Sequence, residues 1–133
     1  MIVYRRPVRF EEVDAARIVF FARFFNYAHE AMEHFFDGVE GGYAGLITKR
    51  EIGLPAVKVD ATFHAPLRYG DVVDIETGCQ KIGNRSIGLV YRFKRGAVIC
   101  AQVTHTVVTT DLRTMRPCDM PADLRAILVE HQE

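Results

Sequence analysis

Residues 21–37 read FARFFNYAHEAMEHFFD, and this stretch decides the fold. Its apolar side chains recur at spacings of three and four, which is the period of an α-helix with one wide apolar stripe. The stripe comprises Phe21, Phe24, Phe25, Ala28, Ala31, Met32, Phe35 and Phe36. Gly38 follows at the position expected for a C-cap glycine. Because so aromatic a helix is poorly suited to lie exposed, we expect the rest of the chain to wrap around it.

The segments on either side alternate with a period of two, which is typical of strands with one buried face. The alternation begins at residues 2–10, where Phe10 falls on the same face as Ile2. Turn residues at Gly83-Asn84 and Arg95-Gly96 predict two connections between later strands. Further strands are predicted over 57–65, from 73 onward, over 87–93 and over 98–110, with short helices near 43–49 and over 121–129.

The predicted order is therefore a strand, a long buried helix, a loop, four consecutive strands and a short helix. One helix buries its stripe most simply when a curved antiparallel sheet rolls around it. We expect an α+β fold in a single domain over residues 1–133. The outer sheet face or an edge strand would then be free to contact a second subunit, so we expect a homodimer or homotetramer.

Composition excludes several classes of protein. The chain has 133 residues, and its 17 Lys plus Arg balance 17 Asp plus Glu, so a generic electrostatic binder of nucleic acid is not expected. No apolar run reaches the roughly 20 residues that span a bilayer. The first residues lack the apolar region and cleavage site of a signal peptide, so none is expected. The three cysteines are widely spaced, which fits a reducing cytoplasm better than a disulfide framework.

The sequence offers little support for a metal site or for a nucleophilic serine or cysteine. His29 and His34 resemble a zinc-binding helix pair but are five residues apart, so they project about 140° from each other and cannot share one ion. Ser86 does not lie in a GxSxG motif. Cys79 and Cys100 fall inside strands, where small core residues are expected.

Asp14 is the more informative candidate, because it precedes the buried helix by a few residues. The start of a helix offers unpaired N–H groups and the positive end of a dipole, which would polarise a carbonyl and stabilise an oxyanion. A nearby carboxylate could attack that carbonyl or activate a water. Spacing alone also allows the alternative that Asp14 is only a turn or capping residue.

Four segments resemble the 4-hydroxybenzoyl-CoA thioesterase family, whose fold is the hotdog fold, a curved antiparallel sheet wrapped around one long helix. They are residues 10–25 (FEEVDAARIVFFARFF), 60–71 (DATFHAPLRYGD), 81–86 and 121–124. The family hydrolyses acyl-CoA thioesters without a metal, so the resemblance implies no cofactor, with coenzyme A entering as part of the substrate.

The resemblance also implies residue roles. Asp14 would be the catalytic carboxylate, as nucleophile or general base, and the backbone N–H of Phe21 would polarise the thioester carbonyl. Arg17 stands where the family's motif has glycine. The hairpin residues Lys81, Arg85 and Ser86 would contact the phosphates of coenzyme A, often in the site of a neighbouring subunit; a solvated turn is the alternative.

Phe20, Phe24, Thr62 and His64 are the candidates for contact with the acyl group. The alternatives are that the two phenylalanines belong to the core and that His64 faces solvent or a subunit interface. An aromatic acyl-CoA such as 4-hydroxybenzoyl-CoA is the favoured substrate, ahead of short or medium aliphatic chains. Glu30 on the helix is interpreted as structural, because Asp14 already fills the role of the carboxylate. Two other functions stay open at this point: an acyl-thioester hydratase or dehydratase, and a non-catalytic acyl-CoA-binding module.

Overall fold

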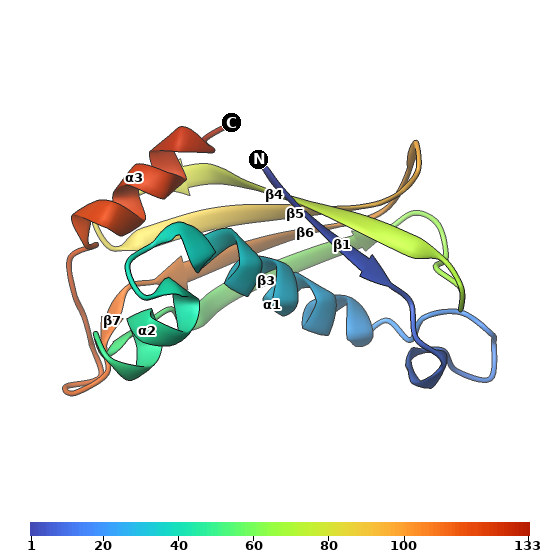
Figure 1. Cartoon of the computed structure of the whole chain (residues 1–133), viewed down its shortest axis with the longest axis horizontal. Coiled ribbons are helices and arrows are strands. Elements are labelled where there is room, and N and C mark those ends of the chain that lie inside the picture. Colours follow the sequence, from blue (N-terminus) through green and yellow to red (C-terminus); the bar gives the residue numbers. More distant parts are fainter.

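A five-stranded antiparallel sheet and one long helix form the body of the chain (Figure 1). The computed structural model describes residues 1–133. The sheet runs in the order β1-β4-β5-β6-β3. Its strands are β1 (Ile2–Pro7), β3 (Ala56–Phe63), β4 (Val72–Ile82), β5 (Ser86–Arg95) and β6 (Val98–Val108). A smaller three-stranded sheet joins β2 (Ile52–Gly53), β7 (Thr110–Asp111) and β8 (Arg116–Pro117).

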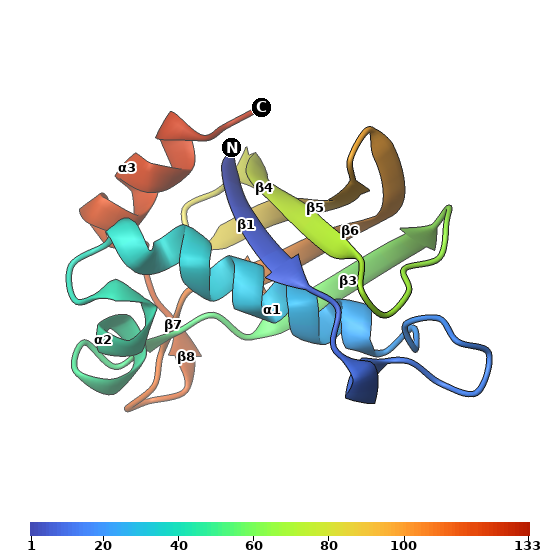
Figure 2. The ribbon, with the colours of Figure 1, turned by 45° about the vertical axis from the view of Figure 1, so that its right-hand side comes forward.

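The long helix α1 (Arg23–Phe35) lies against the curved sheet and continues into the 3-10 turn η2 (Phe36–Gly38) (Figure 2). The remaining helical elements are η1 (Phe10–Glu12), α2 (Gly42–Thr48) and α3 (Ala122–Glu130). The buried face of α1 consists of Phe24, Tyr27, Ala28, Ala31, Met32 and Phe35. It packs against inward side chains of the sheet in one continuous core. The predicted hotdog fold is confirmed.

The sheet obtains part of its curvature from three breaks in strand register. They lie between Ala56 and Lys58, between Cys79 and Lys81, and between Phe93 and Lys94. An extra residue on one strand bends it and increases its twist. The sheet can therefore wrap the helix while its alternating inner face stays continuous.

Three side-chain predictions need correction. Phe10 does not continue the inward face of the first strand: β1 ends at Pro7, the chain turns into η1, and Phe10 is 73% exposed. Gly38 ends η2 and not α1, whose C-cap is Phe36, and the next glycines, Gly41 and Gly42, are the left-handed ones in this segment. Phe25 lies at the margin of the helical stripe and is 39% exposed.

Strand β3 is an edge strand that hydrogen-bonds only to β6. Two of its apolar side chains, Val57 and Val59, are more than 40% exposed. An apolar edge with unpaired backbone groups is a template for pairing with another chain.

Two further findings concern the chain as a whole. Cys79 and Cys100 are buried free thiols in β4 and β6, which confirms that they are core residues. No helix of the structure combines the length and apolar composition needed to cross a membrane.

Candidate active site

Asp14 lies in a tight loop between η1 and α1, here called the Asp14 loop (residues 13–19). Val13 and Val19 form an antiparallel bridge across its base. Within it, the Asp14 N–H donates to the Ile18 carbonyl at 3.0 Å, and the Arg17 N–H donates to the Asp14 carbonyl at 2.9 Å. These bonds close a turn that holds Asp14 at a fixed place next to the start of α1.

The Asp14 carboxylate is exposed and only partly engaged. One oxygen, Oδ1, accepts a hydrogen bond from the Ala16 N–H at 2.8 Å, which orients the side chain. The other oxygen has no partner in the chain. That oxygen is free to attack an electrophile or to accept a proton from water.

Arg17 closes the turn in the left-handed conformation, with φ of 66°. This conformation costs an L-residue about 1–2 kcal/mol, whereas glycine adopts it freely but loses more entropy on folding. We therefore expect Arg17→Gly to raise the free energy of unfolding by about 0.5–1 kcal/mol in urea titrations. Arg17→Ala keeps the Cβ, so its free energy of unfolding should stay near that of the parent. If Arg17→Gly lowered the free energy of unfolding, the turn would not carry the strain described here.

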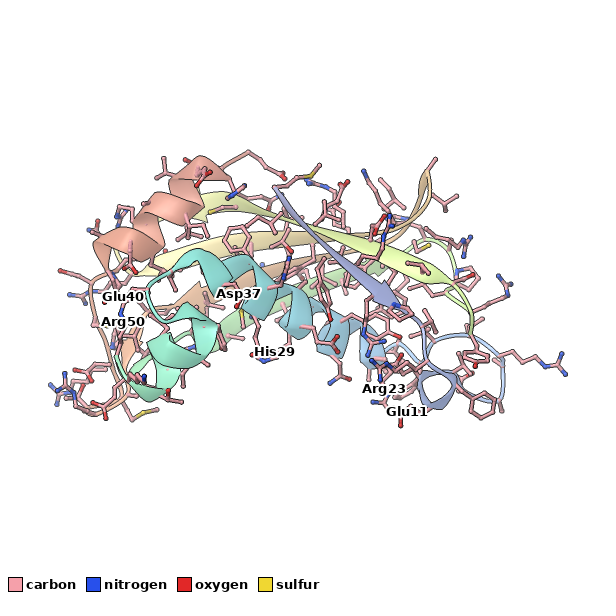
Figure 3. All side chains as sticks on the ribbon, in the orientation of Figure 1. Glu11, Arg23, His29, Asp37, Glu40 and Arg50 are labelled. Atoms are coloured by element: carbon pink, nitrogen blue, oxygen red, sulfur yellow. The ribbon has the colours of Figure 1, made fainter.

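The start of α1 carries free donors. Its N-cap, Ala22, contributes no side-chain hydrogen bond, and the backbone N–H groups of Phe21 and Ala22 have no acceptor in the chain. Figure 3 shows Arg23, the first residue of α1, at the same end of the molecule as Glu11 of η1. Unpaired donors at the positive end of the helix dipole form a place that attracts a carbonyl oxygen or an anion.

A cleft of about 580 Å³ is lined by both Asp14 and the residues that precede α1, and it is here called the Asp14 cleft. Five of the predicted site residues line it together: Asp14, Phe20, Phe21, Phe24 and His64. The other lining residues are Ile18, Val19, Phe63, Ala65 and Pro66. Phe63 was not among the predicted site residues, although its place in the apolar alternation of residues 57–65 was a usable signal. The cleft is mostly apolar, with one carboxylate and one histidine.

Aromatic rings shape the interior of the cleft. Phe24 packs edge-on against Phe63, with ring centroids 5.1 Å apart. The ring centroids of Phe20 and Phe21 are 5.0 Å apart. Such walls favour a flat apolar group, because aromatic rings pair in edge-to-face and offset arrangements.

Four predicted site residues lie elsewhere. Thr62 is on β3 but does not line the cleft. The hairpin with Lys81, Arg85 and Ser86 joins β4 to β5 at the opposite end of the sheet, beside α3 (Figure 1). Arg85 there pairs with Asp119 at 3.1 Å. Within one chain this hairpin cannot reach the Asp14 cleft.

A buried polar network supports the base of the Asp14 loop. Arg6 is 8% exposed and forms a bidentate pair with Glu12, a second pair with Glu30 at 2.8 Å, and a stacking contact 4.1 Å above the Tyr27 ring. The Tyr27 hydroxyl also donates to Glu12, at 2.8 Å. Glu30 thus takes part in this network, and its structural role stays a prediction.

Glu12 connects this network to the loop. Its carboxylate accepts from the Arg9 N–H at 2.8 Å, and its carbonyl accepts from the Phe20 N–H at 3.1 Å. Burial would raise the pKa of Glu12, but hydrogen bonds from Arg6, Arg9 and Tyr27 hold it below its usual value. Glu12 therefore remains an anion that fixes both ends of the segment carrying Asp14.

Comparisons with known proteins show which family the chain resembles. A family model described as the thioesterase-like superfamily matches residues 8–128. A 1,4-dihydroxy-2-naphthoyl-CoA hydrolase of Prochlorococcus marinus (strain MIT 9211) is 28% identical over 94% of this chain and 87% of its own length. The enzyme of that name in Nostoc punctiforme is 27% identical over 91% and 82% of the respective chains.

Solved structures share the same fold. The BH1999 gentisyl-coenzyme A thioesterase has a TM-score of 0.85 and 28% identity, covering 96% of this chain and 99% of its own. A thioesterase-superfamily protein from Jannaschia sp. CCS1 has a TM-score of 0.92 and 22% identity, covering 99% and 93%.

Proposed function

This chain belongs to the thioesterase-like superfamily and is a thioester hydrolase of the hotdog-fold family, and from that premise we propose that it hydrolyses aromatic acyl-CoA thioesters at the Asp14 cleft. One observation carries the proposal. A carboxylate with a free oxygen and a helix N-terminus with unpaired N–H groups line one apolar cleft. The reaction needs an attacking group and an oxyanion binder at a single carbon.

The chemistry assigned to these groups is simple. The Phe21 N–H donates to the thioester carbonyl oxygen and stabilises the negative charge that develops there. Asp14 either attacks the carbonyl carbon, forming an anhydride that water then cleaves, or accepts a proton from a water that attacks. In both routes the C–S bond breaks, the thiolate takes up a proton, and the products are a free acid and coenzyme A.

The lining of the cleft supports an aromatic acyl group. Phe20, Phe24 and Phe63 line the cleft with flat apolar rings. The curated relatives described above are named for an aromatic acyl-CoA, which agrees with this reading. Short and medium aliphatic chains are the second candidates, since an apolar wall also accepts them.

A second subunit completes the site in this proposal. If two copies pair through antiparallel β3 edges, the Ala56 end of one strand lies beside the Phe63 end of the other. Ala56 pairs with Val107, and Val107 with Ile87, next to the hairpin that carries Ser86. The partner's hairpin would then approach the Asp14 cleft, where Lys81 and Arg85 could contact phosphates of coenzyme A. Light scattering should accordingly give a dimer or tetramer mass.

The test is a thiol-release screen. Benzoyl-, 4-hydroxybenzoyl-, acetyl- and hexanoyl-CoA are each incubated with the protein and a chromogenic thiol reagent. We expect free thiol from the aromatic thioesters, with higher kcat/KM than from the aliphatic ones. Preference for the aliphatic pair would refute the assigned acyl class. Absence of thiol from all four, or modification of the acyl chain with the thioester intact, would refute the proposed hydrolysis.

A further inference from the structure

A second hollow lies on the other side of the Asp14 loop. It has a volume of about 560 Å³ and shares only Asp14 with the Asp14 cleft. Its lining consists of Phe10, Val13, Asp14, Ala15, Arg17, Arg68 and Tyr69, and it is here called the arginine cleft. A substrate whose carbonyl lies at Asp14 can therefore extend in two directions, one apolar and one cationic.

The two arginines of this cleft have no acidic partner. Seven of the 13 arginines of the chain form ion pairs, for example Arg50 with Asp123 at 2.7 Å and Arg92 with Glu133 at 2.7 Å. Neither the Arg17 nor the Arg68 side chain forms an ion pair or a hydrogen bond within the chain. Their guanidinium groups thus keep all their donors available for an anion that enters from solvent.

The backbone at Arg17 makes this arrangement more informative. The turn requires a left-handed residue, which glycine would supply without strain. The chain instead bears the strain of an arginine there, beside Asp14. Strained backbone persists where the surrounding structure holds it and often lies at functional sites. The observation points to a use for the side chain itself.

Aromatic side chains complete the cleft. Phe10 and Tyr69 are 73% and 62% exposed, and their rings pack edge-on with centroids 5.6 Å apart. They contribute little to the core, yet they form an apolar wall next to two cations. A planar group carrying a negative charge fits such a surface, with its ring on the aromatic wall and its anion on the guanidinium groups.

We propose that the arginine cleft is an anion subsite for the thioester substrate, formed by Arg17 and Arg68 with Phe10 and Tyr69. This proposal rests on the proposed function, because it assumes a thioester carbonyl at Asp14. The anion has two possible sources with the same chemistry: a phosphate of coenzyme A, or an acidic substituent on the acyl group. Both would be held in the chain's own cleft, independently of the hairpin of a second subunit.

Four thioesters distinguish these sources. Benzoyl and 4-carboxybenzoyl groups are each attached to coenzyme A and to N-acetylcysteamine, which lacks phosphates. Each is assayed for thiol release with the parent, Arg17→Ala and Arg68→Ala. Arg116→Ala is the matched control, since Arg116 is an exposed arginine on β8 without an ion pair. Circular dichroism melts establish that each variant is folded.

We expect each cleft variant to lower kcat/KM about tenfold on the anionic substrates, the loss typical of one charged hydrogen bond. A loss on both coenzyme A thioesters but not on benzoyl-N-acetylcysteamine assigns a phosphate. A loss on both carboxybenzoyl thioesters but on neither benzoyl thioester assigns an acyl anion. Equal losses on all four substrates, or no loss beyond that of Arg116→Ala, would overturn the subsite.

The same panel separates this proposal from the proposed function. Turnover of benzoyl-N-acetylcysteamine by the parent needs the Asp14 cleft alone. If the parent hydrolyses it and the arginine variants do not discriminate, only the anion subsite fails. If the parent releases thiol from none of the four thioesters, the hydrolase assignment itself fails.

Discussion

Asp14→Asn is expected to lower kcat for thioester hydrolysis by about 10²–10⁴-fold, the usual contribution of a positioned acid–base group. The amide has nearly the shape of the carboxylate and can still accept from the Ala16 N–H, so the turn should survive. It cannot take a proton at neutral pH, and it is a poor nucleophile. Because the cleft keeps its walls, KM should change much less than kcat. Steady-state thiol release with 4-hydroxybenzoyl-CoA measures both.

The matched control for this substitution is Asp37→Asn. Asp37 is an exposed aspartate in η2, at the far end of α1 from the cleft (Figure 3). Asp37→Asn makes the same chemical change away from the site, so the kcat of this variant should equal that of the parent. Retention of more than a tenth of the parent kcat by Asp14→Asn would contradict the catalytic role.

Arg6→Met is expected to lower the free energy of unfolding by about 3–5 kcal/mol, as when one member of a buried pair is removed. Arg6 is buried, and its loss would leave the Glu12 carboxylate without its main counter-charge. Urea titration followed by circular dichroism measures the change. The double variant Arg6→Met/Glu12→Leu should lose less than the sum of the single variants, because it removes both charges together.

Arg5→Met is the control next to it in sequence. Arg5 points outward from the same strand and pairs with Asp74 at 2.8 Å, where it is 74% exposed. Exposed pairs contribute at most about 1 kcal/mol, so this variant should remain near the parent. If Arg6→Met and Arg5→Met proved equally mild, the buried network would not be what holds the Asp14 loop.

Acid should weaken the same network. The pKa of Glu12 is lowered in the folded chain, so the unfolded chain binds more protons over that range. The stability that Glu12 contributes is present above its unfolded pKa, at about 4.3, and is lost as pH falls through the lower folded value. Urea midpoints should drop between pH 5 and 3, and the drop should be shallower in Arg6→Met/Glu12→Leu.

Much of the fold could be predicted from local patterns. The helical spacing of residues 21–37 gave α1, and the alternation of Ile87, Leu89, Tyr91 and Phe93 gave the inner face of β5, all four of which are fully buried. Glycine and proline positions marked the turns. Periodicity works here because each element buries one face against the same core.

The buried pairing of Arg6 was not predicted from the sequence, and the reason is physical. Arg6 falls at an inward position of the β1 alternation, between Tyr4 and Val8, yet charged residues are rarely buried unless they are paired. Its partners Glu12 and Glu30 are 6 and 24 residues away, and pairing at such distances depends on tertiary structure. The inward position of Arg6 in the alternation of β1 was the one signal in the sequence for this network.

In the candidate site, too, residues close in sequence could be predicted together, whereas residues joined by tertiary structure could not. Asp14, Phe21 and their apolar neighbours are close in sequence, so a motif could place them in one cleft. Arg68 and Tyr69 come from the segment before β4 and line one cleft with Arg17. A hydrogen bond of 2.8 Å from the Val19 N–H to the Leu67 carbonyl joins the two segments. A single sequence does not reveal that contact. The hairpin of Lys81 and Arg85 needs a second subunit to approach the cleft.

The geometry at Asp14 can be tested most directly by a crystal structure of Asp14→Asn with benzoyl-CoA, whose thioester should survive in the slow variant. The account predicts the carbonyl oxygen about 2.7–3.1 Å from the Phe21 nitrogen, with the side chain of residue 14 beside the carbonyl carbon. The benzoyl ring should lie between Phe20, Phe24 and Phe63. A thioester bound with its carbonyl away from the start of α1, or with residue 14 turned from it, would contradict the account.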